Sequence, residues 1–377
     1  MTPDERFMGQ ALGLARRAYG RTSPNPMVGA VLVQKGRVIG RGWHHRAGAP
    51  HAEVEALADA ARRGHAVQGS TIYVTLEPCC THGRTPPCTE ALVRAGVSRV
   101  VVAAVDPNPS HAGRGLDLLR QAGISVESGV LESESARLNE AFNHWIVHRT
   151  PWVTAKSAMT LDGRIATATG ESKWITGPAS RAHAHRLRLG GDAILVGVET
   201  VLADDPSLDV RAQPGFRPPA WFPIKRRIVL DTRARTPSTC RLVSDEARSN
   251  TLVVVGASVP PERLDPLRSR VSVLQAPERD GRIDLRWLMA ELGRQGITHL
   301  LVEGGGTVLA AFFEAGLVDR TAFFYAPRIL GGDDSRRSVA GHGFRSLSEA
   351  PRLAGVESRR FGEDLFLTAR VVRDPGT

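Results

Sequence analysis

Short apolar runs alternate with amphipathic segments along the chain, and this alternation is broken at Arg149–Thr150–Pro151. Proline lacks an amide hydrogen and disfavours helical geometry at the residue before it, so a helix is expected to end there. Alternating helices and strands on both sides of the break indicate two α/β domains. The length of 377 residues agrees with this, because domains average about 150 residues. The sequence therefore predicts domains at 1–148 and 149–377.

The first domain is predicted to begin with a helix and a hairpin and then to alternate. Its helices are expected at 4–19, 51–63, 88–95, 113–122 and 133–147, and its strands at 27–33, 37–43, 70–75, 99–105 and 124–127. This order is typical of a three-layer α/β/α domain. In the second domain, strands are expected at 152–158, 192–197, 227–231, 251–255, 271–274, 298–303 and 320–326, helices at 179–189, 284–295 and 307–315, and a closing hairpin at 354–361 and 364–372.

The composition excludes several classes of protein. Apolar residues make up 42% of the chain and charged residues 23%, which is typical of globular domains. No apolar run approaches the roughly 18 residues that span a bilayer, and the first residues contain acids and no apolar signal segment. We therefore expect a cytoplasmic protein. The net charge of +10 is spread along the chain without a basic arm or an aromatic cluster for RNA, so no nucleic-acid partner is expected.

Three of the four cysteines, Cys79, Cys80 and Cys88, lie within ten residues of one another. In a reducing compartment, clustered thiols are more often metal ligands or catalytic groups than disulfides. His51 stands at the start of a predicted helix, and the cysteine segment joins a predicted strand to another helix. A hydrolytic zinc site needs three protein ligands and one position open for water. One histidine and two thiolates supply that number.

Glu53 lies two residues after His51, which suits a carboxylate that transfers protons beside a metal. A closed structural zinc site is the alternative, with His82 as its fourth ligand. Glu53 argues against this alternative, because a structural zinc needs no acid beside it. Buried free thiols are a further alternative, which suits Cys240 better than the cluster.

The segment from His51 to Glu53 and the one that begins at Pro78 resemble the signature of zinc nucleobase deaminases, H-x-E followed by P-C-x-x-C. Here the second cysteine stands nine residues after the first instead of three. This longer loop resembles the deaminase half of the bifunctional deaminase-reductase family of riboflavin biosynthesis. The resemblance implies a cytidine-deaminase-like domain in which Glu53 is the catalytic proton shuttle, Cys80 has no metal role, and Zn²⁺ is bound by His51, Cys79 and Cys88.

Two segments upstream strengthen the resemblance. Asn25 stands between two prolines, where a rigid backbone would present its amide as donor and acceptor to a pyrimidine edge. His44 follows the predicted hairpin. The resemblance implies substrate contacts in the deaminase pocket at Asn25 and His44, and at Arg84 near the substrate phosphate. The alternative makes Asn25 a turn residue and His44 a solvated strand end.

Residues 298–309 run from an apolar strand through three glycines into a helix. Such a corner can cradle phosphates, because a backbone without Cβ atoms approaches them closely and the first amides of the helix point at them. A plain tight turn is the alternative. Together with the polar segments at 156–166, 171–177 and 197–211, the corner resembles the reductase half of the same family, which has a dihydrofolate-reductase-like α/β fold. This resemblance extends from about residue 151 to the end of the chain.

The resemblance to the reductase half also implies a set of binding residues. NADPH contacts are expected at Ala158, Trp174, Thr200, Asp204, Thr232, Gly305 and Gly306, and substrate contacts at Ser172, Arg188, Leu208, Arg211 and Glu303. Arginines suit a phosphate, which they bind through two parallel hydrogen bonds. The usual Leu-Thr-Val-Arg of the family reads Leu-Asp-Val-Arg here. Asp209 therefore places an acid beside the expected phosphate site.

The resulting hypothesis is a two-step enzyme of riboflavin synthesis that acts on a small phosphorylated pyrimidine. Zinc-dependent hydrolysis would deaminate 2,5-diamino-6-(5-phosphoribosylamino)pyrimidin-4-one, and NADPH would then reduce the ribosyl group to ribityl. One alternative is a nucleic-acid base deaminase with a C-terminal RNA-binding domain. Another is a zinc-stabilised binding protein without activity. The sequence is compatible with a homo-oligomer.

Overall fold

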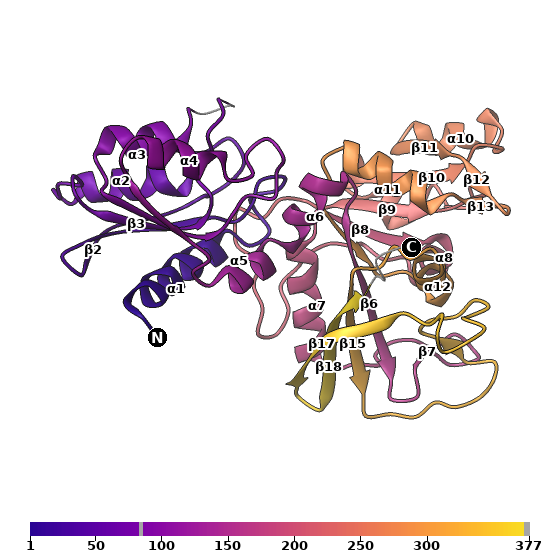
Figure 1. The fold of residues 1–377 in the computed structure, drawn as a ribbon. Coiled ribbons are helices and arrows are strands. Elements are labelled where there is room, and N and C mark those ends of the chain that lie inside the picture. Colours follow the sequence, from indigo (N-terminus) through magenta and orange to yellow (C-terminus); the bar gives the residue numbers. More distant parts are fainter. Residues whose placement is uncertain (83–85, 373–377) are drawn as a thin grey trace. The chain divides into compact units, whose positions relative to one another are not determined.

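The computed structural model describes residues 1–82 and 86–372 (Figure 1). The chain forms two compact units, the first from Met1 to Arg149 and the second from Thr150 onward. Among the described residues, no helix is both long and apolar enough to cross a membrane.

The first unit is built on a five-stranded sheet in the order β2-β1-β3-β4-β5. The strands are β1 (Gly29–Gln34), β2 (Arg37–Trp43), β3 (Thr71–Leu76), β4 (Arg99–Ala104) and β5 (Ser125–Ser128). β1 runs antiparallel to both of its neighbours, whereas β3, β4 and β5 are parallel. The helices are α1 (Pro3–Ala15), α2 (Ala52–Arg62), α3 (Cys88–Ala95), α4 (Arg114–Gln121), α5 (Glu132–Leu138) and α6 (Glu140–His148), with a 3-10 turn at Arg16–Ala18.

Two apolar clusters cover the two faces of this sheet. Ala30 and Leu32 of β1 pack with α2, α3 and α4, while Val31 and Val33 pack with α1 on the other face. Successive side chains of a strand point to opposite faces, so a strand buried on both sides reads as a continuous apolar run. Figure 1 shows α2, α3 and α4 on one side of the sheet and α1 on the other. The predicted three-layer arrangement is confirmed.

The prediction of a single helix at 133–147 is wrong, because the chain forms two helices, α5 and α6, separated at Asn139. The side chain of Asn139 accepts a hydrogen bond from the amide of Met27 at 2.8 Å and donates one to the carbonyl of Met27 at 3.0 Å. Its backbone has φ −113° and ψ 24°, outside helical geometry. A contact between residues 112 apart in sequence therefore breaks a helix that the local pattern favours.

The second unit contains a nine-stranded sheet in the order β11-β10-β9-β8-β14-β6-β15-β18-β17. Its strands are β6 (Trp152–Thr160), β8 (Ala193–Gly197), β9 (Arg226–Leu230), β10 (Thr251–Gly256), β11 (Ser272–Ala276), β14 (His299–Val302), β15 (Arg320–Ala326), β17 (Arg352–Phe361) and β18 (Asp364–Val372). From β11 to β15 all neighbours are parallel, and β18 and β17 add an antiparallel edge. Two short ladders pair β7 (Arg164–Ala166) with β16 (Arg336–Arg337) and β12 (Glu278–Arg279) with β13 (Arg282–Ile283).

Helices cover both faces of this sheet. They are α7 (Pro178–Gly190), α8 (Val198–Asp204), α9 (Arg241–Ser244), α10 (Pro261–Arg268), α11 (Leu285–Arg294) and α12 (Gly306–Glu314), with a 3-10 turn at Arg248–Asn250. The helices α8, α9 and α10 were not expected from the sequence, because α8 has seven residues, α9 has four, and α10 contains Pro266. In an open parallel sheet, ligands bind beyond the carboxyl ends of the strands. A binding site is therefore expected at the loops after β6, β8 and β14.

Candidate functional site

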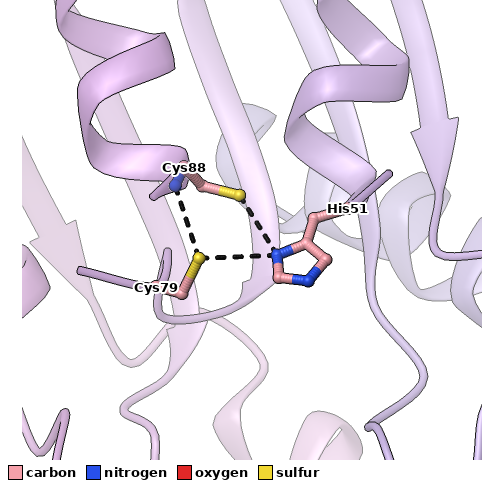
Figure 2. A group of neighbouring side chains, drawn as sticks. All are labelled: His51, Cys79 and Cys88. Carbon is pink, nitrogen blue, oxygen red and sulfur yellow. Dashed lines mark hydrogen bonds between the residues drawn. The ribbon is translucent and has the colours of Figure 1, made fainter. Parts of the chain in front are cut away.

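The three expected metal ligands lie together in the first unit (Figure 2). His51 is the N-cap of α2, Cys88 is the first residue of α3, and Cys79 follows β3. The Nδ1 atom of His51 lies 3.4 Å from Sγ of Cys79 and 3.3 Å from Sγ of Cys88. Tetrahedral zinc, with bonds of about 2.1 Å to nitrogen and 2.3 Å to sulfur, separates such atoms by about 3.6 Å. The donor set and its spacing fit a zinc ion.

The environment of Cys79 favours the thiolate that zinc requires. The backbone amide of Cys88 donates to Sγ of Cys79 at 3.3 Å. Hydrogen bonding from Cys88 and from His51 lowers the pKa of the Cys79 thiol. Because both His51 and Cys88 stand at helix starts, the dipoles of two helices also favour negative charge between them.

Glu53 lines the same cavity, of about 460 Å³, as His51 and Cys79. Its side chain is buried, with 3% of the residue exposed. Burial raises the pKa of Glu53 to about 7. A carboxyl group with a pKa near the working pH can both accept and release a proton, which is what general acid-base catalysis requires.

Asn25 and His44 form a linked pair at the wall of this cavity. Nδ1 of His44 lies 3.0 Å from the carbonyl oxygen of Pro50 and therefore carries the ring proton. Nε2 is then an acceptor, and the amide nitrogen of Asn25 donates to it at 3.0 Å. This network orients the Asn25 amide oxygen as an acceptor for a ligand. The alternative in which His44 is a solvated strand end is wrong, because only 2% of the residue is exposed.

The other residues of the cysteine segment lie outside the ligand group. Cys80 directs its Sγ toward Nδ1 of His111, at 3.4 Å. His82, the fourth ligand of the closed-site alternative, is exposed and lies 3.7 Å from Glu90. Neither joins the group formed by His51, Cys79 and Cys88. Arg84 lies outside the described residues.

Sequence reasoning missed a second group of cavity residues. The loop after β4 contributes Asp106, Asn108 and His111, and α6 contributes Phe142, Trp145 and Ile146. The loop is held by Glu77, whose carboxylate accepts from the amides of Asp106, Gly113 and Gly115 at 3.1, 2.9 and 2.8 Å. A signal was present, because polar residues directly follow the buried strand β4, which neighbours β3 in the sheet.

A cavity of about 750 Å³ lies in the second unit. Most of the expected reductase residues line it, namely Ala158, Ser172, Trp174, Arg188, Thr200, Asp204, Leu208, Arg211, Glu303 and Gly305. Thr232 and Gly306 are not among the lining residues. The carbonyl of Thr232 accepts from the amide of Gly256 at 3.0 Å, beyond the end of β9.

The three glycines after β14 differ in what surrounds them. A Cβ atom at Gly306 would lie 2.2 Å from the carbonyl oxygen of Arg337, and one at Gly304 would lie 2.8 Å from Val308. Packing alone therefore requires glycine at these two positions. At Gly305, which lines the cavity, the nearest atom is Oγ1 of Thr200 at 3.6 Å. Gly305 is the glycine whose side-chain space opens toward a ligand.

Three charged side chains with little exposure, those of Lys156, Arg188 and Glu303, line this cavity together. The carboxylate of Glu303 accepts from Nε of Arg188 at 2.7 Å, from Nη2 of Arg188 at 2.9 Å, and from Nζ of Lys156 at 3.4 Å. Burial opposes ionisation, yet the charges of Arg188 and Lys156 hold the pKa of Glu303 well below its usual range. Lys156 was not predicted as a site residue, although it stands in one of the segments that carry the resemblance.

Taken together, the two units define a class of protein. The first is a three-layer domain with a His-Cys-Cys group beside a buried glutamate, as in zinc-dependent deaminases. Residues 1–104 match the zinc-binding region of cytidine and deoxycytidylate deaminases, and residues 151–367 match the RibD C-terminal domain. The chain belongs to the RibD family of riboflavin biosynthesis proteins, and it is an enzyme with a deaminase half and a reductase half.

Several full-length relatives support this assignment. Riboflavin biosynthesis protein RibD of Aquifex aeolicus is 42% identical over 364 residues, 97% of each chain, and that of Escherichia coli is 42% identical over 370 residues, 97% of this chain and 98% of the relative. The structure of Acinetobacter baumannii RibD superposes with a TM-score of 0.87 at 38% identity and covers 98% of this chain and 99% of that one. The diaminohydroxyphosphoribosylaminopyrimidine deaminase/5-amino-6-(5-phosphoribosylamino)uracil reductase of Thermotoga maritima gives 0.85 at 33% identity, with 98% and 99% covered.

Proposed function

We propose that residues 1–148 deaminate 2,5-diamino-6-(5-phosphoribosylamino)pyrimidin-4-one and that residues 149–377 reduce the ribosyl group of the product to ribityl with NADPH. The observation that carries the proposal is the placement of Glu53 in one cavity with His51 and Cys79, on the same chain as the reductase cavity. The partners are small molecules and not nucleic acids. The enzyme works in the cytoplasm, where the clustered thiols stay reduced.

In the deaminase half, His51, Cys79 and Cys88 hold zinc. Zinc in such a site lowers the pKa of water toward about 7, so that hydroxide is available at neutral pH. Glu53 takes the proton of the attacking water on its carboxylate and delivers a proton to the departing amine. The amino group leaves as ammonia and the ring carbon gains an oxygen. The burial of Glu53 supports this role, because it keeps the proton between reactants and away from solvent.

Asn25 and His44 orient the pyrimidine in this half, and Arg84 binds its phosphate. The fixed tautomer of His44 supports the first assignment, since it leaves the Asn25 amide with a defined acceptor. Burial lowers the pKa of His44, so the ring stays neutral and keeps that tautomer. A pyrimidine edge with N–H donors is complementary to this arrangement.

In the reductase half, NADPH contacts Ala158, Trp174, Thr200, Asp204, Thr232, Gly305 and Gly306, and the substrate contacts Ser172, Arg188, Leu208, Arg211 and Glu303. NADPH supplies the hydride, while the protein positions donor and acceptor. A shared cavity supports most of these assignments, and α12 begins at Gly306 beside that cavity. The first amides of a helix favour the negative charge of a pyrophosphate.

A coupled assay tests both halves on one protein. Ammonia release from the diaminopyrimidine is expected to precede NADPH oxidation, and NADPH oxidation is expected to require the deaminated product. Removing zinc with a chelator is expected to abolish ammonia release and to leave reduction of added deaminated product largely intact. Loss of both activities with the fold preserved by circular dichroism would contradict the separation of the two sites.

Gly305→Val is expected to raise the dissociation constant of NADPH at least about tenfold, which corresponds to about 1.4 kcal/mol. The branched side chain would fill cavity space beside Thr200, where the backbone has to approach the cofactor. Gly305→Ala is the matched control, because a single Cβ atom has room there, and it should bind NADPH nearly normally. A titration followed by NADPH fluorescence measures the dissociation constant of each variant. Unchanged binding by the valine variant would make the corner an ordinary turn.

A further inference from the structure

His185 lies on α7, lines the reductase cavity and has no role in the chemistry described above. Its side chain is buried, with 6% of the residue exposed. Arg188 follows it by three residues and so lies on nearly the same face of the helix. Besides the ion pair of Arg188 with Glu303, these two residues both make polar contacts with one short segment, residues 208–213.

α7 holds this segment at two points of its backbone. Nη1 of Arg188 donates to the carbonyl oxygen of Asp209 at 2.8 Å. The backbone amide of Arg211 donates to Nδ1 of His185 at 3.3 Å. Between these points, Val210 is buried against Ala182 and Leu189 of α7. With Val210 packed inward, the neighbouring Arg211 is left with its side chain about half exposed at the cavity.

The hydrogen bond from Arg211 requires a neutral imidazole with a lone pair on Nδ1. Nε2 then carries the ring proton. It lies 3.2 Å from the side-chain amide nitrogen of Gln213, and we assign this amide the flipped orientation, in which its oxygen accepts from Nε2. Burial, followed by the charges of Arg188 and Arg211, lowers the pKa of His185 to about 4, so the ring is neutral at physiological pH. Both ring nitrogens are thus used to hold the same segment.

We propose that His185 is a positioning residue of the reductase, which holds the backbone of Arg211 so that its guanidinium meets the phosphate of the substrate. This rests on the proposed role of Arg211 in substrate binding. The guanidinium itself is held by Oγ of Ser207 at 3.0 Å and by the carboxylate of Asp209 at 2.5 Å. The direction of the Arg211 guanidinium therefore depends on the position of this loop. Residues of α7 hydrogen-bond the loop backbone, and His185 makes the bond at Arg211 itself.

The test compares His185→Leu with His185→Gln in the full-length enzyme. Leucine fills a similar volume without an acceptor, whereas the glutamine amide oxygen can still accept from the amide of Arg211. The leucine variant is expected to raise KM for the deaminated phosphorylated substrate about tenfold, with kcat and the NADPH dissociation constant unchanged. The glutamine variant is expected to restore KM to within about threefold of wild type. KM for the same substrate without its phosphate should not change in either variant.

Several outcomes would overturn the proposal. It fails if the leucine variant raises KM equally for both substrates, lowers kcat, or is not rescued by glutamine, because a merely structural histidine would do these things. If the leucine variant does not fold, Gln213→Leu replaces it in the test, because it removes the partner of Nε2 of His185 and changes only a half-buried position. This variant is expected to raise KM for the phosphorylated substrate about threefold. An unchanged KM in that variant also overturns the proposal.

Arg211→Ala separates this proposal from the function on which it rests. If Arg211→Ala raises KM for the phosphorylated substrate while His185→Leu does not, the role of Arg211 stands and that of His185 falls. If Arg211→Ala leaves this KM unchanged, the proposed phosphate contact itself is wrong. Ammonia release by the deaminase half of the same variants serves as an internal measure of active protein.

Discussion

Glu53→Gln is expected to lower the rate of ammonia release by a factor of about 100 or more, because a positioned general acid-base group contributes about 10²–10⁴. Glutamine keeps the size and a hydrogen-bonding end but cannot take up or release a proton at neutral pH. Because Glu53 is only 3% exposed, bulk solvent has little access to the place of its carboxylate beside His51 and Cys79. The variant is expected to keep its zinc and its reductase activity.

Glu55→Gln is the matched control, since Glu55 stands in the same first turn of α2 but does not line the cavity. It should release ammonia at a nearly normal rate. Metal analysis and NADPH oxidation on added deaminated product show whether either variant is otherwise intact. Near-normal ammonia release from Glu53→Gln would remove this carboxylate from the mechanism.

Cys88→Ala is expected to lose both zinc and deamination, whereas Cys80→Ala is expected to keep both. The two thiols are distinguished by position. Sγ of Cys88 lies 3.3 Å from Nδ1 of His51, while Sγ of Cys80 lies beside His111. A catalytic zinc site has three protein ligands, so the loss of one leaves a pair that binds the ion far more weakly.

Metal analysis of alanine variants at His51, Cys79, Cys80 and Cys88 measures this directly. Variants at His51 and Cys79 are expected to behave like Cys88→Ala. Reduction of the deaminated product provides the control for folding of the second unit. If Cys80→Ala loses zinc while Cys88→Ala retains it, the ligand assignment is wrong.

The local pattern was sufficient for most elements of both sheets. Helix 88–95 was predicted at the observed bounds of α3, and the strand at 320–326 at those of β15. These segments have a clear period and definite ends, such as Pro87 before α3 and Gly96 after it. The helix predicted at 133–147 failed, because the side chain of Asn139 binds the backbone of Met27 and interrupts it.

The candidate sites, too, contain residues that the sequence predicts and residues that it does not. The ligand group of His51, Cys79 and Cys88 could be predicted because two short motifs carry it and both stand at the ends of elements. The contributions of Asp106 and Trp145 to the same cavity could not, since they depend on which loop and which helix come to line it in the folded chain. In the corner after β14, composition alone did not distinguish Gly305 from Gly306. The structure distinguishes them, because the carbonyl oxygen of Arg337 leaves no space for a side chain at Gly306, whereas Gly305 has that space.

By itself, the sequence determined the alternation of elements and the residue types of the His-Cys-Cys group, because periodicity and motif spacing are properties of neighbouring residues. Only the tertiary structure decided which distant groups meet. Glu303 and Arg188 are 115 residues apart and form a buried ion pair, and His185 reaches the amide of Arg211 across 26 residues. The packing of α7 beside β14 and the loop after α8 brings these groups together, and burial makes an unpaired charge on Glu303 or Arg188 costly enough to require its partner.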